Sequence, residues 1–198
     1  MKIVAASCCK LQNISPQPVW KQIMEEKPDA LVLLGDNVYI VHDHHSDPDD
    51  LTAELKQKYR AQLEELHFAA LLEDLKKRSG RLIAIYDDHD FLGNNRYGGD
   101  YGTALRDAAR DEFVRVFSPQ MTGRDIYSVH RLGLVDVYLL DERYYRKSPR
   151  LSDDSRDAIL GVEQWNWLEQ MLEVQTHAKY TVIASSTTLH TFADESWE

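Results

Sequence analysis

Five short apolar runs, each followed by polar side chains that can bind metal or carry protons, constrain the fold of this chain more than any other feature. They lack regular alternation with polar residues, which is typical of strands that are covered on both faces. We therefore predict five buried strands: Ile3–Ala6, Ala30–Leu34, Leu82–Tyr86, Val135–Leu140 and Tyr180–Ala184.

Apolar residues recur at helical spacing between these runs. Four helices are expected, and the second is long and ends near a capping Gly80: Pro18–Glu26, Leu51–Arg78, Ala104–Phe117 and Val162–Val174. Alternating strands and helices predict an α/β fold. The 198 residues contain no repeat or linker, so we expect a single domain over 1–198.

Ligands of open α/β sheets bind beyond the carboxyl ends of the strands. Every predicted strand here ends in polar or coordinating groups. One such end is uninformative, but five together indicate a shared site. The segments are Ser7–Cys9, Gly35–Tyr39, Asp87–Asp90, Asp141–Arg143 and Ser185–Thr188.

The segment Gly35–Tyr39 begins with a glycine, which lets the backbone turn sharply after a strand. Asp36 would then lie at the sheet edge, where one carboxylate can bridge two cations. Tyr39, three residues later, could turn back toward the same point, and its phenolate suits ferric iron. The alternative is that Asp36 caps the next segment and Tyr39 packs in the core. These residues alone leave the two interpretations level.

The segment Asp87–Asp90 places His89 among three acids. This arrangement suits metal ligation or proton transfer, and we favour it over a solvated acidic turn. Asn94 and Asn95 add neutral oxygen donors nearby. Arg96 and Arg143 could clamp an anion through forked hydrogen bonds, or form salt bridges with nearby acids.

Cys8 follows the first predicted strand, where its thiolate could complete a metal sphere, although an inert thiol is the commoner case. Cys9 is expected in the core. Adjacent cysteines rarely form a disulfide, and free thiols are consistent with a reducing compartment. The histidine-rich segment His42–Asp50 is discounted as a loop without a rigid scaffold. The histidines at 67, 130 and 177 are interpreted as structural or exposed, and nothing local supports a role for His190.

A net charge of -10 disfavours a grip on nucleic acid or on an anionic membrane. A phosphate-binding site would need local cations, and bound metal is the obvious source. The sequence has neither an apolar run of membrane-spanning length nor a cleavable signal sequence at its start. We expect a soluble protein and favour the cytoplasm.

The motifs together resemble the alkaline phosphatase D family of metallophosphoesterases, which has some likeness to purple acid phosphatases. Their order and spacing make the resemblance specific across nearly the whole chain. The matching segments are Ala6–Cys8, Pro16–Trp20, Lys27–Asp29, Leu34–Tyr39, Tyr86–Asp90, Asn94–Asn95, Leu139–Tyr144, Leu160–Leu168 and Ala184–Ser186.

The resemblance implies a layered α/β/β/α sandwich with two metal ions at the strand ends. It implies Cys8, Asp36 and Tyr39 around ferric iron (Fe³⁺), with Asp36 bridging to a second ion, often calcium (Ca²⁺). Asp88 and Asn94 would serve the second ion, and the neighbouring Asp87 and Asn95 stay open as alternatives. We expect Cys8, Asp36, Tyr39 and Asp88 to converge on the pair of ions.

The resemblance also implies hydrolysis of a small phosphoric mono- or diester. A metal-activated hydroxide would attack phosphorus, and His89 would protonate the leaving group. Asn95, Arg96 and Arg143 are candidates for contacts with the substrate.

One departure bears on activity. The family carries a later Gly-Asp-x-His-like segment with further metal ligands, and the sequence reaches Glu198 without one. Gly99–Asp100 follows no predicted strand and is no substitute. We therefore expect a fragment or a shortened relative. The alternative function is a catalytically inactive metal-binding domain, and a weaker third is a cysteine enzyme that uses Cys8.

Overall fold

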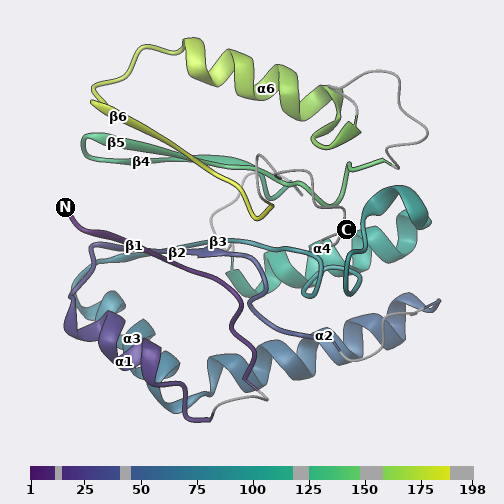
Figure 1. Cartoon of the computed structure of the whole chain (residues 1–198), viewed down its shortest axis with the longest axis horizontal. Coiled ribbons are helices and arrows are strands. Elements are labelled where there is room, and N and C mark those ends of the chain that lie inside the picture. Colours follow the sequence, from purple (N-terminus) through teal and green to yellow (C-terminus); the bar gives the residue numbers. More distant parts are fainter. Residues whose placement is uncertain (12–14, 41–45, 118–124, 148–157, 188–198) are drawn as a thin grey trace, which may run out of the picture.

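The computed structural model describes residues 1–11, 15–40, 46–117, 125–147 and 158–187. Two three-stranded sheets pack face to face in this part of the chain, and helices cover their outer faces (Figure 1). The expected layered α/β/β/α arrangement is confirmed. Its helices and strands position every loop of the candidate site.

The first sheet is parallel, in the order β1, β2, β3. Its strands are β1 (Ile3–Ala6), β2 (Ala30–Leu34) and β3 (Arg81–Ile85). Ala30 of β2 pairs with Ile3 on one side and with Arg81 on the other. Parallel pairing brings the three carboxyl ends to one edge of the sheet.

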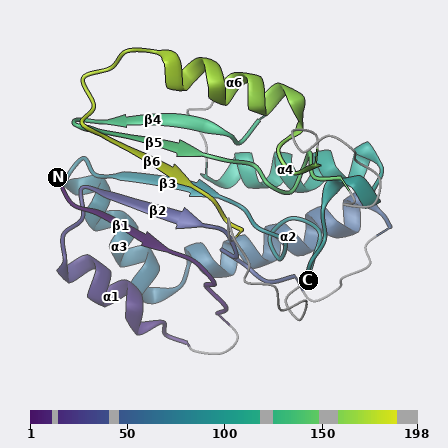
Figure 2. The same ribbon diagram turned by 45° about the horizontal axis from the view of Figure 1, so that its top comes forward.

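The second sheet contains β4 (Ser128–Leu132), β5 (Val135–Leu139) and β6 (Tyr180–Ala184). β5 pairs antiparallel with β4 and parallel with β6. The arrows of β1, β2, β3, β5 and β6 point to the same side of the molecule (Figure 2). The prediction of five strands missed β4, because this strand is only partly buried and its sequence SVHRL is not an apolar run.

In the part of the chain that the structure describes, four helices cover the first sheet and one covers the second (Figure 1). The first group is α1 (Pro18–Glu25), α2 (Pro48–Leu63), α3 (Leu66–Lys77) and α4 (Thr103–Phe117). The helix on the second sheet is α6 (Gly161–Glu173), and a short 3-10 turn, η1 (Gly98–Asp100), precedes α4. None of the helices described is long and apolar enough to cross a membrane.

The single helix expected over Leu51–Arg78 is wrong, because the chain breaks between α2 and α3. Glu65 has extended backbone, and its carboxylate caps α3 by accepting a hydrogen bond from Phe68 N at 2.7 Å. The same side chain accepts from Gln17 N at 3.0 Å. This contact, distant in sequence, makes the break favourable although the leucine spacing continues across it.

The two faces of the first sheet explain why the apolar runs do not alternate. In β2, Leu31 and Leu33 belong to the core shared with the helices, whereas Ala30 and Val32 belong to the core between the sheets. A third core lies between the second sheet and α6 and includes Leu168. A strand buried on both faces needs apolar side chains at successive positions.

Candidate metal centre

The site is built on two loops that leave neighbouring parallel strands. The β2 loop is defined here as residues 35–40 and the β3 loop as residues 86–97. Gly35 (φ 90°) and Asp36 (φ 53°) both have left-handed backbone. A Cβ on Gly35 would lie 2.5 Å from Asp87 Cβ, so only glycine lets the two loops approach this closely.

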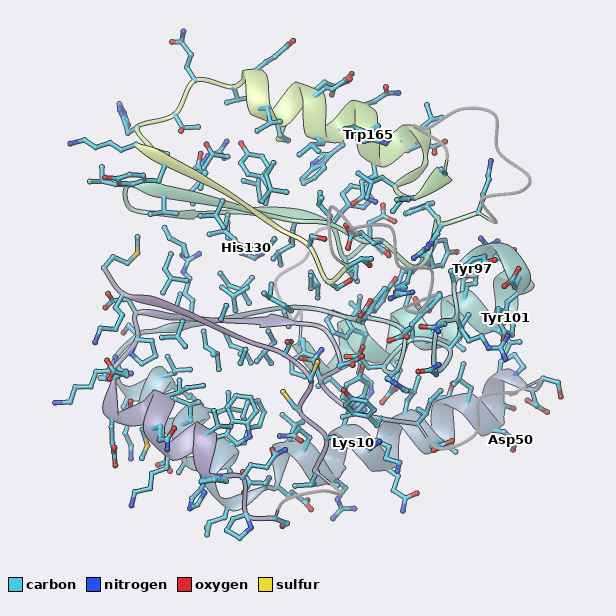
Figure 3. The ribbon with its side chains drawn as sticks, viewed as in Figure 1. Lys10, Asp50, Tyr97, Tyr101, His130 and Trp165 are labelled. Carbon is cyan, nitrogen blue, oxygen red and sulfur yellow. The ribbon has the colours of Figure 1, made fainter. Side chains whose placement is uncertain are left out.

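Tyr39 turns back onto Asp36 within the β2 loop. Its hydroxyl donates a hydrogen bond to Asp36 Oδ2 at 2.6 Å, and its ring lies 4.3 Å from that of His89. Burial raises the pKa of Tyr39 well above its usual value, and the neighbouring Asp36 and Cys8 raise it further. Cys8 therefore lies beside this hydroxyl. Lys10, on the segment after β1, lies over the Tyr39 ring at 5.0 Å (Figure 3).

Asp36, Asp88 and His89 form a cluster that could hold a cation. One ligand atom from each lies within 4.8 Å of those from the other two. Burial raises the pKa of Asp36 to about 6, the hydrogen bond from Tyr39 opposes this, and the charges of Asp88 and Asp87 add to it. Two carboxylates this close repel each other unless a proton or a cation lies between them.

The cluster also contains buried polar atoms that the rest of the described chain leaves without a hydrogen bond. These atoms are Asp36 Oδ1 and His89 Nδ1. Buried polar atoms are normally paired, so such atoms beside a second carboxylate fit a cation. Carboxylate and phenol oxygens suit hard cations, and imidazole suits transition metals. The residues present therefore fit a metal ion.

Asp88 is held rigidly within the β3 loop. Its Oδ1 accepts from His89 N at 2.8 Å, and its Oδ2 accepts from Asn95 N at 2.6 Å. Its backbone carbonyl accepts from Phe91, Leu92 and Gly93. The carboxylate therefore keeps one orientation relative to Asp36.

The adjacent Asp87 belongs to a different set of contacts. Arg143 Nε lies 2.6 Å from Asp87 Oδ1, and Ser186 Oγ donates to the same oxygen at 3.0 Å. Burial lowers the pKa of the Arg143 guanidinium. The hydrogen bond to Asp87 and the negative charges of Asp87, Asp88 and Glu142 outweigh this effect, so the pKa is raised. The salt bridge foreseen as an alternative for Arg143 is thus present.

The remaining candidates lie outside the group of Asp36, Asp88 and His89. Cys8 is exposed, has a φ of 58°, and contacts Tyr39 rather than the group of three. Asn94 and Asn95 are exposed in the β3 loop, and Arg96 is half-buried. Of the predicted site residues, the structure thus brings together Asp36, Tyr39, Asp88 and His89, and places Cys8 next to Tyr39.

Histidines outside the cluster have other surroundings. His67 Nδ1 lies 3.0 Å from Gln17 O, His130 Nε2 lies 3.1 Å from Ser128 Oγ, and His177 is exposed. His130 is in β4, on the second sheet (Figure 3). The histidines at 42, 44, 45 and 190 lie outside the described residues.

Asp90 and Asn37 are two buried residues to which the sequence assigns no separate role. Asn37 Nδ2 donates to Ile85 O at 2.8 Å and to the Asp90 carboxylate. Backbone amides of both loops also donate to Asp90. The only sequence signal was the position of Asp90 inside the acidic turn.

Comparisons with known proteins place these observations in a family. The family model described as "PhoD-like phosphatase" matches residues 3–198. A solved structure titled "Structure of PhoD" is similar, with a TM-score of 0.68 and 21% sequence identity. The match covers 92% of this chain and 41% of the chain in that structure. This chain therefore spans less than half the length of the protein it matches. The search of curated proteins gave no match.

Proposed function

This chain belongs to the PhoD-like phosphatase family, and on that premise we propose that it forms the metal-binding part of a hydrolase of phosphoric mono- or diesters. The observation that carries the proposal is the cluster of Asp36, Asp88 and His89, with its ligand atoms within 4.8 Å and a buried Asp36 oxygen left without a hydrogen bond. Small phosphoesters are the proposed substrates.

The proposed centre is dinuclear, with Asp36 between the ions. Asp36, Tyr39 and Cys8 would hold one ion, for which Fe³⁺ suits the phenolate. Asp88 and Asn94 would hold the other, proposed to be Ca²⁺, which prefers carboxylate and amide oxygens. When bound, two cations neutralise charge on the phosphoryl oxygens and make water acidic enough to act as a nucleophile.

His89 is the proposed general acid for the leaving-group oxygen. It lies in the same cluster as the two carboxylates, and its ring packs against that of Tyr39 at 4.3 Å between centroids. Packing against a neighbouring ring restricts the orientation of the imidazole. A proton donor held at a fixed position is what general acid catalysis requires.

Arg143 is the proposed main contact for a phosphoryl oxygen, with Arg96 and Asn95 as further proposed contacts. The ion pair with Asp87 uses Arg143 Nε and fixes the plane of the guanidinium. The two terminal nitrogens of a guanidinium carry further N–H donors that match phosphoryl oxygens. The negative pair of Asp36 and Asp88 would need its cations in place before an anionic substrate could approach.

The test is the substitution Asp36→Asn in the 198-residue chain, loaded with Fe³⁺ and Ca²⁺. We expect loss of hydrolysis of p-nitrophenyl phosphate and bis-p-nitrophenyl phosphate, and less bound metal by elemental measurement. Asp136→Asn is the matched control, because Asp136 is also a buried aspartate, 3% exposed against 9% for Asp36, and lies in β5. Full activity of Asp36→Asn would overturn the proposal. Metal binding without turnover by the unsubstituted chain would favour the catalytically inactive alternative.

A second readout concerns Tyr39. A tyrosinate bound to ferric iron absorbs visible light, so we expect a visible band in the iron-loaded chain and its loss in Tyr39→Phe. Tyr97→Phe, a substitution of the tyrosine at the end of the β3 loop, should keep the band (Figure 3). A band that survives Tyr39→Phe would remove this residue from the proposed ligands.

A further inference from the structure

We infer that Asp90 is a positioning residue: its buried carboxylate ties the β2 loop to the β3 loop and so sets the separation of Asp36 and Asp88. This inference rests on the proposed metal-binding function. It assigns to Asp90 a role in metal affinity without contact between Asp90 and the metal. The contacts below come from both loops and converge on one side chain.

The β2 loop contributes three donors. Asp36 N lies 3.3 Å from Asp90 Oδ1, and Asn37 N lies 2.9 Å from Oδ2. The Asn37 side-chain amide donates to Oδ2 at 2.5 Å. These residues are 53 and 54 positions from Asp90 in the chain, so the contacts join two separate segments of the fold.

The β3 loop contributes a further donor, and strand β3 and helix α2 each provide an anchor. Asp87 N lies 2.6 Å from Asp90 Oδ1, which closes the loop around the two positions between them. Asn37 Nδ2 also donates to Ile85 O at the end of β3. Tyr59 of α2 donates from its hydroxyl to Asp90 O at 3.3 Å. Asp90 is thereby fixed to the sheet, to a helix and to both loops.

The geometry makes the carboxylate hard to replace. Asp90 is 0% exposed, and each of its two carboxylate oxygens accepts hydrogen bonds from two N–H groups. An amide in its place offers only one accepting oxygen, so Asp90→Asn leaves buried N–H groups opposite an NH₂ group. The loops must then move apart, and the ligand atoms on Asp36 and Asp88 move with them.

A residue that orients ligands without touching the metal has a recognisable effect. Substitution of such residues typically weakens metal affinity by about 10–100-fold. A carboxylate with a purely structural role would change the stability of the chain and leave metal affinity alone once the chain is folded. Metal affinity of the folded variant therefore separates the two roles.

The experiment measures Tb³⁺ binding by luminescence sensitised through nearby aromatic rings. Tb³⁺ is a hard cation suited to carboxylate and phenol oxygens, and Tyr39 provides a ring at the site. We expect the folded Asp90→Asn chain, checked by circular dichroism, to bind Tb³⁺ on the order of 10–100-fold more weakly. Asp136→Asn controls for the loss of a buried aspartate, because Asp136 is 3% exposed and lies in β5. Its Tb³⁺ affinity should equal that of the unsubstituted chain.

A second measurement needs no substitution and remains available if Asp90→Asn does not fold. The backbone amides of Asn37 and Asp87 donate to the same carboxylate, so opening of this contact should expose both. We expect the two amide hydrogens to exchange with the same free energy of opening, and Tb³⁺ to slow both by the same factor. Independent exchange of the two amides would overturn the inference.

The outcomes separate this inference from the proposed function. Equal Tb³⁺ affinity in Asp90→Asn and Asp136→Asn overturns the positioning role alone. Absence of Tb³⁺ binding by the unsubstituted chain overturns both proposals. Weakened Tb³⁺ binding in Asp90→Asn, with no phosphoester turnover by the unsubstituted chain, supports the positioning role and removes only the hydrolase.

Discussion

Arg143 and Asp87 form an ion pair that connects the two sheets at their carboxyl ends, with Arg143 Nε 2.6 Å from Asp87 Oδ1. Arg143 follows β5, and Asp87 follows β3. Their side chains are 8% and 16% exposed, respectively. Ser186, just after β6, donates to the same Asp87 oxygen. Three strand ends from two sheets thus meet at one carboxylate, next to the candidate metal ligands.

The ion pair predicts strong coupling between its partners. Asp87→Asn leaves Arg143 charged and largely buried, so we expect the free energy of unfolding to fall by about 3 kcal/mol. Arg143→Met should have a similar cost. The double variant should lose less than the sum of the single losses, by about 1–3 kcal/mol. Urea denaturation of the four proteins measures this difference, and additive losses would contradict the pair.

The neighbouring acids Asp87 and Asp88 should behave differently toward metal. Asp88 shares the cluster with Asp36 and His89, whereas Asp87 pairs with Arg143. We expect Asp88→Asn to weaken Tb³⁺ binding at least about tenfold, because a carboxylate ligand and its charge are lost. Asp87→Asn, the matched control, should lower stability and keep Tb³⁺ affinity within a few-fold. The reverse pattern would assign the ligand to Asp87.

His89 lies in the cluster with Asp36 and Asp88 but is proposed as the general acid, so we expect its substitution to affect the leaving group more than metal affinity. His89→Asn should lower kcat for an alkyl phosphate by about 10²–10⁴-fold, since an alkoxide needs a proton as it departs. The loss should be smaller for p-nitrophenyl phosphate, because its leaving group is already stable as an anion. Tb³⁺ affinity of the same variant serves as the control. A large fall in that affinity would make the imidazole a metal ligand.

The apolar runs predicted the strands well because burial on both faces leaves a strong pattern. The bounds of β1, β2 and β6 agree with the predicted runs, and those of β3 and β5 differ by one residue at their ends. The missed strand β4 has an intermediate or exposed residue at every position except Leu132. A weakly buried strand carries little pattern of its own and is identified by its partner β5.

The candidate site shows where prediction from sequence ends. Residue types after the strands identified the loops, because coordinating side chains at strand ends point to chemistry. Which acid of the Asp87–Asp90 turn approaches the Asp36 carboxylate depends on the path of the loop. Asp90 instead binds the backbone amides of Asp36 and Asn37, more than 50 positions distant. A single sequence carries no signal for such contacts, so the position of Asp90 could not be deduced from it.

A pH dependence of stability is expected from Asp141. Burial raises the pKa of Asp141 to about 6, although Tyr144 N, Tyr86 and Arg143 N donate to its carboxylate and lower it. The folded chain therefore binds this proton more tightly than the unfolded chain. The stability that the protonated Asp141 contributes is fully present below about pH 4 and is lost as the pH rises through about 6. A shift of about two pKa units corresponds to roughly 3 kcal/mol.

The measurement compares the unsubstituted chain with Asp141→Asn in urea at several pH values between 4 and 8. The amide does not titrate, so the stability of the unsubstituted chain relative to the variant should fall by roughly 3 kcal/mol over this range. Comparing two chains removes the titration of all other groups. Parallel curves would show that Asp141 keeps an ordinary pKa in the fold.

Substitution of Gly35 by alanine tests the close approach of the β2 and β3 loops, and the same substitution at Gly102 is the matched control. In Gly35→Ala, the new Cβ would lie 2.5 Å from Asp87 Cβ on a backbone with φ 90°, so strain and overlap add. We expect the free energy of unfolding to fall by about 2–4 kcal/mol, and Tb³⁺ affinity to fall in any folded fraction. A Cβ on Gly102 meets no atom within 4 Å, so Gly102→Ala should change stability by no more than about 0.5 kcal/mol. Equal stability of the two variants, measured by urea denaturation, would mean that the β2 and β3 loops do not approach as closely as this cluster requires.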